Sequence, residues 1–137
     1  MNDTISQQNN FTDKKPKILL IDDEQIMLDA MHEILLMDGN YESDMKGSAR
    51  EAILKLQQDT YNLIVSDIRM PGMSGYDLYE WVAKHKPEIV KKIVFTSGDP
   101  YDPETKKFLE KTHNPCLIKP FKVDEFLFLI AQTLKSA

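Results

Sequence analysis

The chain has 137 residues, of which 42% are apolar and 28% charged, a composition typical of a single globular domain with a buried core. Its net charge of −5 argues against a general attraction to nucleic acid or anionic membranes, and no apolar run approaches the ~20 residues of a membrane span. The N-terminus lacks a hydrophobic signal segment and Cys116 is the single cysteine, so we expect a cytoplasmic protein without an intrachain disulfide that contacts neither nucleic acid nor membrane.

The first sixteen residues are rich in Asn, Gln, Ser and Thr and end in Lys14-Lys15-Pro16. A stretch of this composition carries too few apolar side chains to pack against a core. We therefore expect a flexible tail or linker over 1–16, followed by one domain over 17–137.

Five short apolar runs follow, the second of them weak, and we expect each to form a strand. Two of them, Leu63–Val65 and Ile93–Phe95, show no polar alternation, as expected for parallel strands that are covered on both faces. The runs are Lys17–Ile21, Tyr41–Met45, Leu63–Val65, Lys92–Phe95 and Cys116–Ile118.

The segments between these runs show helical spacing of apolar residues. The first helix has a stripe of Met27, Met31 and Ile34, and the second begins at the capping-box pattern Ser48-Ala-Arg-Glu51. The remaining helices are predicted over 75–86, over 103–113 with Phe108 and Leu109 as anchors, and over 123–134. Strands that alternate with helices through right-handed crossovers predict an α/β three-layer sandwich.

Polar residues gather where these strands end. The first strand runs into Asp22-Asp23-Glu24, the third into Ser66-Asp67, the fourth into Thr96-Ser97 and the fifth into Lys119-Pro120. Ligands bind at the carboxyl ends of the strands in such a sheet. Adjacent carboxylates repel each other, by about 4 kcal/mol for a pair ~4 Å apart at an effective dielectric near 20. The acidic run is therefore either a hydrated loop without a metal or part of a cation site.

The residue types at this rim suit the chemistry of acyl phosphates. Acidic oxygens bind Mg²⁺, and a further carboxylate can attack phosphorus and carry the phosphoryl group. Lys119 and Thr96 can stabilise the oxygens of the transferred group.

The chain resembles the receiver domains of two-component response regulators over residues 17–135. The resemblance rests on ILLIDDE at 18–24, DIRMPGMSG at 67–75, IVFTSG at 93–98 and KPF at 119–121, in this order and each after an apolar run. It implies a flavodoxin-like (βα)5 fold with a parallel sheet in the order 2-1-3-4-5.

The same resemblance implies a role for each rim residue. Asp67 corresponds to the phosphoacceptor, and Thr96 and Lys119 to the family's hydroxyl and lysine. The resemblance places the Mg²⁺ site on Asp22, Asp23, Asp67 and the backbone carbonyl of Arg69. It further implies a domain that takes its phosphoryl group from a histidine kinase or a histidine phosphotransfer protein. Such a domain is not an enzyme beyond its own phosphorylation and dephosphorylation.

Within the family, the chain looks most like the terminal receiver of a hybrid histidine kinase. The segments behind this finer likeness are Phe95–Asp99, Phe108–Lys111 and Asn114–Phe121. The sequence leaves open whether the domain stands alone or belongs to such a kinase.

Other functions are less well supported. A magnesium-dependent phosphatase of the haloacid dehalogenase type would share the aspartyl-phosphate chemistry, but it needs a D-x-D pattern and a cap. A flavodoxin-fold binding module would need a glycine-rich phosphate loop. His113 and Cys116 have metal-ligand chemistry, but a zinc site needs about four ligands.

Two further residues carry expectations. Helical spacing places the core face of the last helix on Phe126, Ile130 and Leu134, with Val123 and Leu127. Phe128 then faces outward. It is either a contact for a partner or a second copy, or a surface aromatic residue without a role. Cys116 stands where many receivers have an aromatic ring. We therefore expect coupling through the loop 97–102, with modest changes along 104–113.

Overall fold

The computed structural model of the protein describes residues 14–136, so most of the predicted tail lies outside the described residues. Five parallel strands form one sheet in the order β2-β1-β3-β4-β5, which confirms the predicted topology. The strands are β1 Lys17–Ile21, β2 Glu42–Lys46, β3 Leu63–Asp67, β4 Ile93–Ser97 and β5 Cys116–Ile118.

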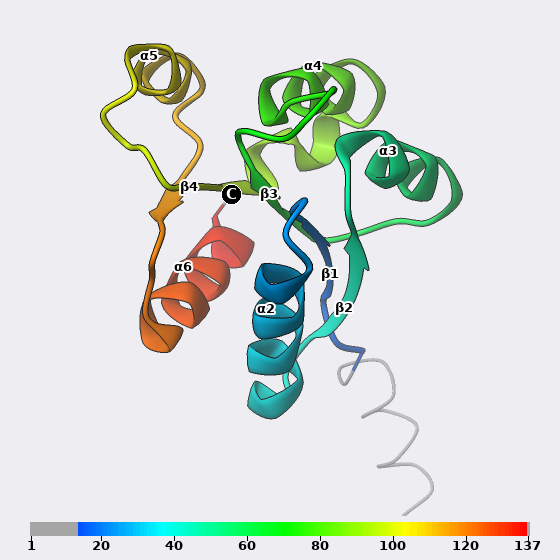
Figure 1. The fold of residues 1–137 in the computed structure, drawn as a ribbon. Helices are drawn as coiled ribbons and strands as arrows, with labels where there is room; N and C mark the ends of the chain where they lie inside the picture. The colour runs from blue at the N-terminus through cyan, green and yellow to red at the C-terminus, as the bar shows by residue number, and fades with distance from the viewer. Residues whose placement is uncertain (1–13, 137) are drawn as a thin grey trace, which may run out of the picture.

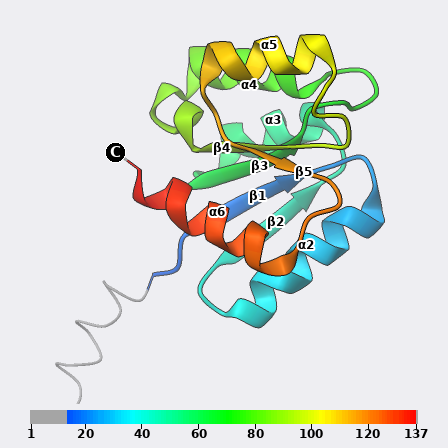
Figure 2. The ribbon, with the colours of Figure 1, turned by 90° about the vertical axis from the view of Figure 1, so that its left-hand side faces the viewer.

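Helices cover both faces of this sheet. Figures 1 and 2 show α2 and α6 on one face and α3, α4 and α5 on the other. The helices are α2 Gln25–Asp38, α3 Ala49–Gln58, α4 Gly75–His85, α5 Pro103–Thr112 and α6 Val123–Lys135, with a 3-10 helix at Pro87–Lys92 that the sequence patterns do not predict. None of the helices within residues 14–136 is long and apolar enough to cross a membrane.

Alternate residues of each strand supply two separate cores, because successive side chains of a strand point to opposite faces. Leu19 and Ile21 face α3 and α4, where they join Ile64, Leu78 and Val82. Ile18 and Leu20 face α2 and α6, and their neighbours there include Leu28, Met31, Val65, Phe126 and Ile130. The central strands are buried on both sides, as their uninterrupted apolar runs predict.

Several local predictions differ from the structure. In α2 the fully buried residues are Leu28, Met31 and Leu35, so the core-facing stripe is rotated from the predicted one, and Met27 and Ile34 pack only partly. At α3, the Ser48 hydroxyl accepts a hydrogen bond from the Glu51 amide. The second bond of a full capping box, from the Ser48 amide to the Glu51 side chain, is not formed within the described residues.

The expected core face of α6 is correct at Phe126 and Ile130, only partly buried at Leu127 and Leu134, and wrong at the first residue of the helix. Phe126 and Ile130 are buried, whereas Val123 is 54% exposed, so its predicted core position is wrong. Val123 is the first residue of the helix, and it is not among the residues that pack against the core. The core position near the end of the helix is taken by Thr133, whose hydroxyl donates to the Leu129 carbonyl at 2.7 Å.

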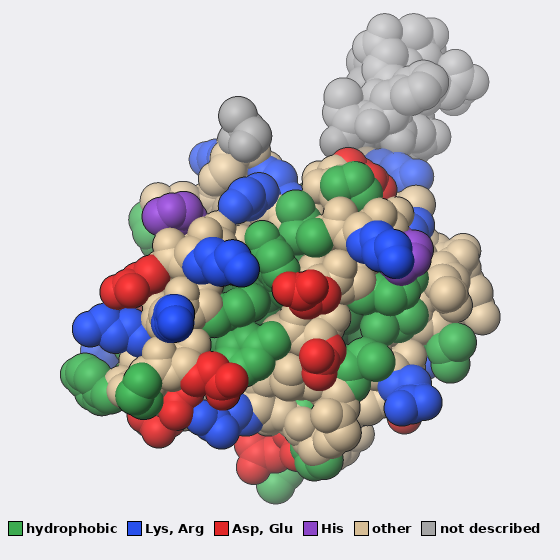
Figure 3. Space-filling view, turned by 90° about the horizontal axis from the view of Figure 1, so that it is seen from above, with side chains coloured by type: hydrophobic (Ala, Val, Ile, Leu, Met, Phe, Trp, Pro, Cys, Tyr) green, Lys and Arg blue, Asp and Glu red, His purple; other side chains and the backbone are tan. Residues whose placement is uncertain are grey.

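The outer face over α3, α4 and α5 combines charged side chains of both signs with apolar ones (Figure 3). Figure 3 shows acidic and basic side chains interspersed there, with apolar side chains between them. The interspersed charges are consistent with the modest net charge of −5.

Candidate functional site

Three carboxylates meet where β1 and β3 end. Asp22, Asp23 and Asp67 each offer an oxygen, and these oxygens lie within 4.8 Å of one another. Asp22 and Asp67 are buried, whereas Asp23 is exposed. The order of strands in the sheet brings these carboxylates together. β1 and β3 are neighbours in the sheet, and the aspartates stand at or directly after the carboxyl ends of these two strands. Among residues 14–136 this is the one group of acidic, histidine or cysteine side chains close enough to hold a metal ion.

Lys119 extends from the end of β5 into this cluster. Its Nζ donates to Asp22 Oδ2 at 2.8 Å and to Asp67 Oδ2 at 3.3 Å. Burial alone would lower the pKa of Lys119, but the hydrogen bond to Asp22 and the charges of Asp67 and Asp22 raise it overall above its ordinary value. The lysine therefore stays charged and supplies one positive charge to the cluster.

The carboxyl group of Asp67 is held in an unfavourable environment for its charge. Burial raises its pKa, Lys119 opposes that shift, and Asp22 and Asp23 add to it, so the pKa lies above its usual range. One lysine thus compensates the three carboxylates incompletely. A bound cation would supply the missing positive charge.

Thr96 faces Asp67 from the neighbouring strand. The two residues are paired in the register of β3 and β4. Thr96 is fully buried, and its Oγ1 has no hydrogen-bond partner within the described part of the chain. An unpaired buried hydroxyl costs about 1–3 kcal/mol. Beside the Asp67 carboxylate, such a group is suited to bind an oxygen atom of a ligand.

Gly75 lets α4 begin directly behind Asp67. A Cβ atom at this position would lie 2.7 Å from the Asp67 carbonyl oxygen and 2.9 Å from the Ile68 Cα. The Gly75 amide instead donates to the Ile68 carbonyl at 2.8 Å, and a complete capping box at Ser74 and Asp77 starts the helix. The glycine closes the motif that begins at Asp67, and its steric role was not predicted from the sequence.

The Arg69 side chain contacts a residue that is far away in the sequence. The guanidinium forms an ion pair of 2.7 Å with Asp102, which lies in the loop between β4 and α5. The predicted role of Arg69 concerns its backbone carbonyl and stays a prediction. Asp102 was missed from the sequence, although an Asp-Pro pair before a helical segment is a recognised helix start.

The other candidate residues lie outside the cluster. Ser66 is buried and its hydroxyl donates to the Asp67 carbonyl at 3.0 Å. His113 ends α5 in a left-handed conformation with φ 62°. Cys116 is half-buried against the core, and burial, with a smaller contribution from the Asp67 charge, raises its pKa to about 11. Its thiol is therefore protonated at neutral pH.

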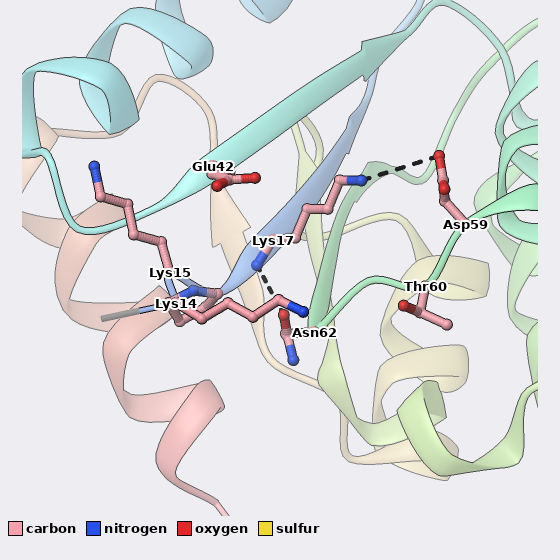
Figure 4. A pocket seen from close by; sticks show the side chains of 8 residues that line it. Lys14, Lys15, Lys17, Glu42, Asp59, Thr60 and Asn62 are labelled. Atoms are coloured by element: carbon pink, nitrogen blue, oxygen red, sulfur yellow. Dashed lines mark hydrogen bonds and ion pairs between the residues drawn. The ribbon is translucent and has the colours of Figure 1, made fainter. Parts of the chain in front are cut away.

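A second hollow lies at the opposite, amino end of the strands. It has a volume of about 440 Å³ and includes Lys14, Lys15 and Lys17 in its lining (Figure 4). Lys17 lies 3.9 Å from both Asp44 and Asp59, and its backbone amide donates to the Asn62 side chain. Because Lys17 is already paired with carboxylates, we place the functional site at the other end of the sheet.

The chain is similar to known proteins in sequence and in fold. Residues 18–131 match the family described as the response regulator receiver domain. The chain is 31% identical over 112 residues to the C4-dicarboxylate transport transcriptional regulatory protein DctD of Rhizobium meliloti. That match covers 82% of the chain and 24% of DctD, so the chain spans about a quarter of the length of this curated relative.

Solved structures agree in fold. A CheY-like response regulator receiver domain protein from Methanospirillum hungatei superposes with a TM-score of 0.80 at 28% identity, covering 88% of this chain and 94% of that one. The chemotaxis protein CheY4 of Vibrio cholerae superposes with a TM-score of 0.78 at 25% identity, covering 87% of this chain and 98% of that one.

Proposed function

Because the chain belongs to the response regulator receiver domain family, we propose that Asp67 accepts a phosphoryl group from a phosphohistidine on a partner protein. The partner is a histidine kinase or a histidine phosphotransfer protein. The proposal rests on the surroundings of the buried Asp67 carboxylate. It accepts a hydrogen bond from the Lys119 ammonium, and it lies opposite Thr96, whose hydroxyl has no hydrogen-bond partner within the described residues.

The proposed reaction is an in-line displacement at phosphorus. An Asp67 carboxylate oxygen attacks, a phosphorus–oxygen bond forms, and the phosphorus–nitrogen bond to the imidazole breaks. The imidazole leaves with the bonding electron pair and takes up a proton. Lys119 offsets the charge on the phosphoryl oxygens, and the Thr96 hydroxyl donates to one of them.

The donor set at this rim fits Mg²⁺. Asp22, Asp23 and Asp67 present hard oxygen ligands from one compact cluster, and Asp23 is open to water. We propose that these residues, with the Arg69 backbone carbonyl, hold the ion. When bound, Mg²⁺ supplies positive charge to the oxygens of the transferred group.

Exposed apolar side chains follow three of the segments that form the acceptor site. Ile26 lies just after the acidic run, Tyr101 in the loop after Thr96, and Val123 just after Lys119, and all three are exposed. They can pack around a partner residue that presents phosphohistidine to Asp67. The narrower predictions, a terminal receiver of a hybrid kinase and a cytoplasmic location, stay predictions.

The phosphatase alternative is not favoured, because the chain matches the receiver family over most of its length. The two functions differ in turnover. A receiver gains one covalent phosphoryl group and loses it by autodephosphorylation, whereas a phosphatase releases phosphate repeatedly from an external substrate.

Mass measurement after treatment with acetyl phosphate tests the proposal. We expect a gain of one phosphoryl group with Mg²⁺ present, little gain after chelation of the metal, and none in Asp67→Asn. Asp38→Asn, which changes an exposed carboxylate at the end of α2, is the matched control and should be labelled like the wild type. Wild-type labelling of Asp67→Asn would refute the acceptor assignment, and phosphate release over many turnovers would favour the phosphatase.

A further inference from the structure

An ion pair joins the two loops that flank the acceptor site. Arg69 follows Asp67 by two residues in the loop between β3 and α4, and Asp102 ends the loop between β4 and α5. Their side chains meet at 2.7 Å, with the Arg69 side chain 60% exposed and that of Asp102 17% exposed. The contact therefore ties the loop after the phosphoacceptor to the loop after Thr96.

Asp102 uses both of its carboxylate oxygens. Oδ1 binds Arg69, while Oδ2 accepts from the backbone amide of Thr105 at 2.9 Å and from its hydroxyl at 3.0 Å. These last two bonds cap the N-terminus of α5. The backbone bond from Thr105 is the main cause that lowers the pKa of Asp102, with smaller contributions from Arg69. Asp102 is thus charged at neutral pH, and it connects Arg69 directly to the start of α5.

The connection continues from α5 to α4. The buried Thr105 hydroxyl lies 2.9 Å from the Tyr76 hydroxyl, and because Thr105 donates its hydrogen to Asp102, Tyr76 is the donor here. The Tyr76 ring packs on Phe108, with ring centres 4.6 Å apart. A continuous set of contacts therefore runs from Arg69 through Asp102 and Thr105 to Tyr76.

The rest of the loop before α5 is held mainly by bonds among its own residues. The Asp99 amide donates to Ser97 Oγ at 3.1 Å, and the Tyr101 amide donates to Asp99 Oδ1 at 3.3 Å. These short-range bonds can move with the loop as a unit. The Arg69–Asp102 pair is what fastens this unit to the neighbouring loop.

We propose that the Arg69–Asp102 pair is a latch that holds the loop 98–102 and the first turn of α5 in the unphosphorylated protein, and that phosphorylation opens it by offering Arg69 a second anion. This inference rests on the proposed function, because the phosphoryl group would stand on Asp67. A phosphoryl group carries a charge of about −2 at neutral pH and has three acceptor oxygens, against the single charge of Asp102. A guanidinium binds such groups in a bidentate manner, and the Arg69 side chain is 60% exposed and follows Asp67 by two residues.

The opening is confined to the first turn of α5. Further along the helix, Phe108 stays packed between aromatic rings, at 5.4 Å from Tyr79 and 5.2 Å from Phe95. Residues 98–106 therefore become more mobile while the rest of α5 keeps its position.

Amide hydrogen exchange on the unphosphorylated protein tests the latch directly. In Arg69→Gln and in Asp102→Asn we expect exchange over 98–106 to be about two- to fivefold faster, the change in opening equilibrium that corresponds to one exposed ion pair. Asn is also a good N-cap, so Asp102→Asn removes the charge pair and keeps the cap. Lys55→Gln, which removes the 2.9 Å pair of Lys55 with Asp59 in α3, should leave 98–106 unchanged. Unchanged exchange in both latch variants would overturn the proposal.

A beryllofluoride mimic of the phosphoryl group tests the opening. In the wild type it should speed exchange over 98–106 to about the level of Arg69→Gln, and in Arg69→Gln it should add no further change there. Equal increments in both proteins would show that the phosphoryl group acts on this loop without Arg69, which overturns the opening step. If the mimic changes exchange nowhere in the wild type, both the proposed function and the opening of the latch by phosphorylation are refuted. The comparison of Arg69→Gln and Asp102→Asn with the wild type, made without the mimic, still decides whether the ion pair holds the loop.

Discussion

At the scale of single residues, the function proposed for Asp67 conflicts with the stability of the fold. Its carboxylate is buried beside Asp22 and Asp23, and its pKa is raised mainly by that burial. The folded protein therefore binds this proton more tightly than the unfolded chain does. The stability that follows is fully present at low pH and is lost as pH rises through the folded-state pKa of Asp67.

This linkage predicts that Asp67→Asn is more stable than the wild type at pH 7 in metal-free buffer. The neutral amide removes the buried charge, so we expect a melting temperature higher by a few degrees, as measured by thermal unfolding. The gain should shrink as pH falls through the raised folded-state pKa of Asp67 and should be absent below the ordinary pKa of aspartate. Added Mg²⁺ should also reduce the difference in melting temperature between the variant and the wild type, because the ion stabilises the wild type. A variant that melts below the wild type at pH 7 would contradict this prediction.

Cys116 shows a second residue-scale effect, which bears on signalling. The thiol is half-buried against a core that includes Phe95 and Phe108. It offers no ring that could rotate inward, as expected from the sequence. Movement after phosphorylation is then expected in the loop 97–102, where the Arg69–Asp102 pair acts, with modest change along the rest of α5.

At the scale of elements, the start of α4 against the end of β3 determines where Asp67 lies. Gly75→Ala would place a methyl group 2.7 Å from the Asp67 carbonyl oxygen, and backbone atoms cannot give way as a flexible side chain can. We expect a loss of about 1–3 kcal/mol in the free energy of unfolding, measured in urea, and slower labelling by acetyl phosphate.

Gly47 offers the matched control for this substitution. A Cβ atom there would meet nothing within 4 Å, and its φ is not in the left-handed region. Gly47→Ala should therefore change the unfolding free energy by less than about 0.5 kcal/mol. If both variants lose the same stability, the close approach of α4 to β3 is not what requires glycine at position 75.

At the scale of the whole molecule, the outer face of α6 is a candidate for contacts with other proteins. Phe128 is 67% exposed, which confirms the outward direction expected from helical spacing. We predict that Phe128→Ser weakens self-association at high protein concentration, measured by light scattering, and leaves labelling by acetyl phosphate intact. Leu54→Ser, which removes an exposed apolar side chain of α3 on the opposite face, should not affect self-association. Equal association of all three proteins would leave Phe128 without a role in self-association.

Much of the fold could be predicted because its signals are local. Uninterrupted apolar runs mark the central strands, helical stripes mark the layers between them, and the polar rim follows because parallel strands end on the same side. Errors arise where the local signal is weak. The 3-10 helix at Pro87–Lys92 has no apolar period, and β2 is a half-exposed edge strand displaced by one residue from the prediction.

The sequence by itself determined the class of the protein, the order of its elements and the set of polar residues at the rim, because each depends on residue type and spacing along the chain. Only the tertiary structure decided how those residues contact one another. It shows which carboxylates share Lys119, that the Thr96 hydroxyl is buried without a partner, and that Arg69 pairs with Asp102. These contacts join segments far apart in the chain. They depend on how α4 and α5 pack on the sheet, which no local pattern of residues specifies.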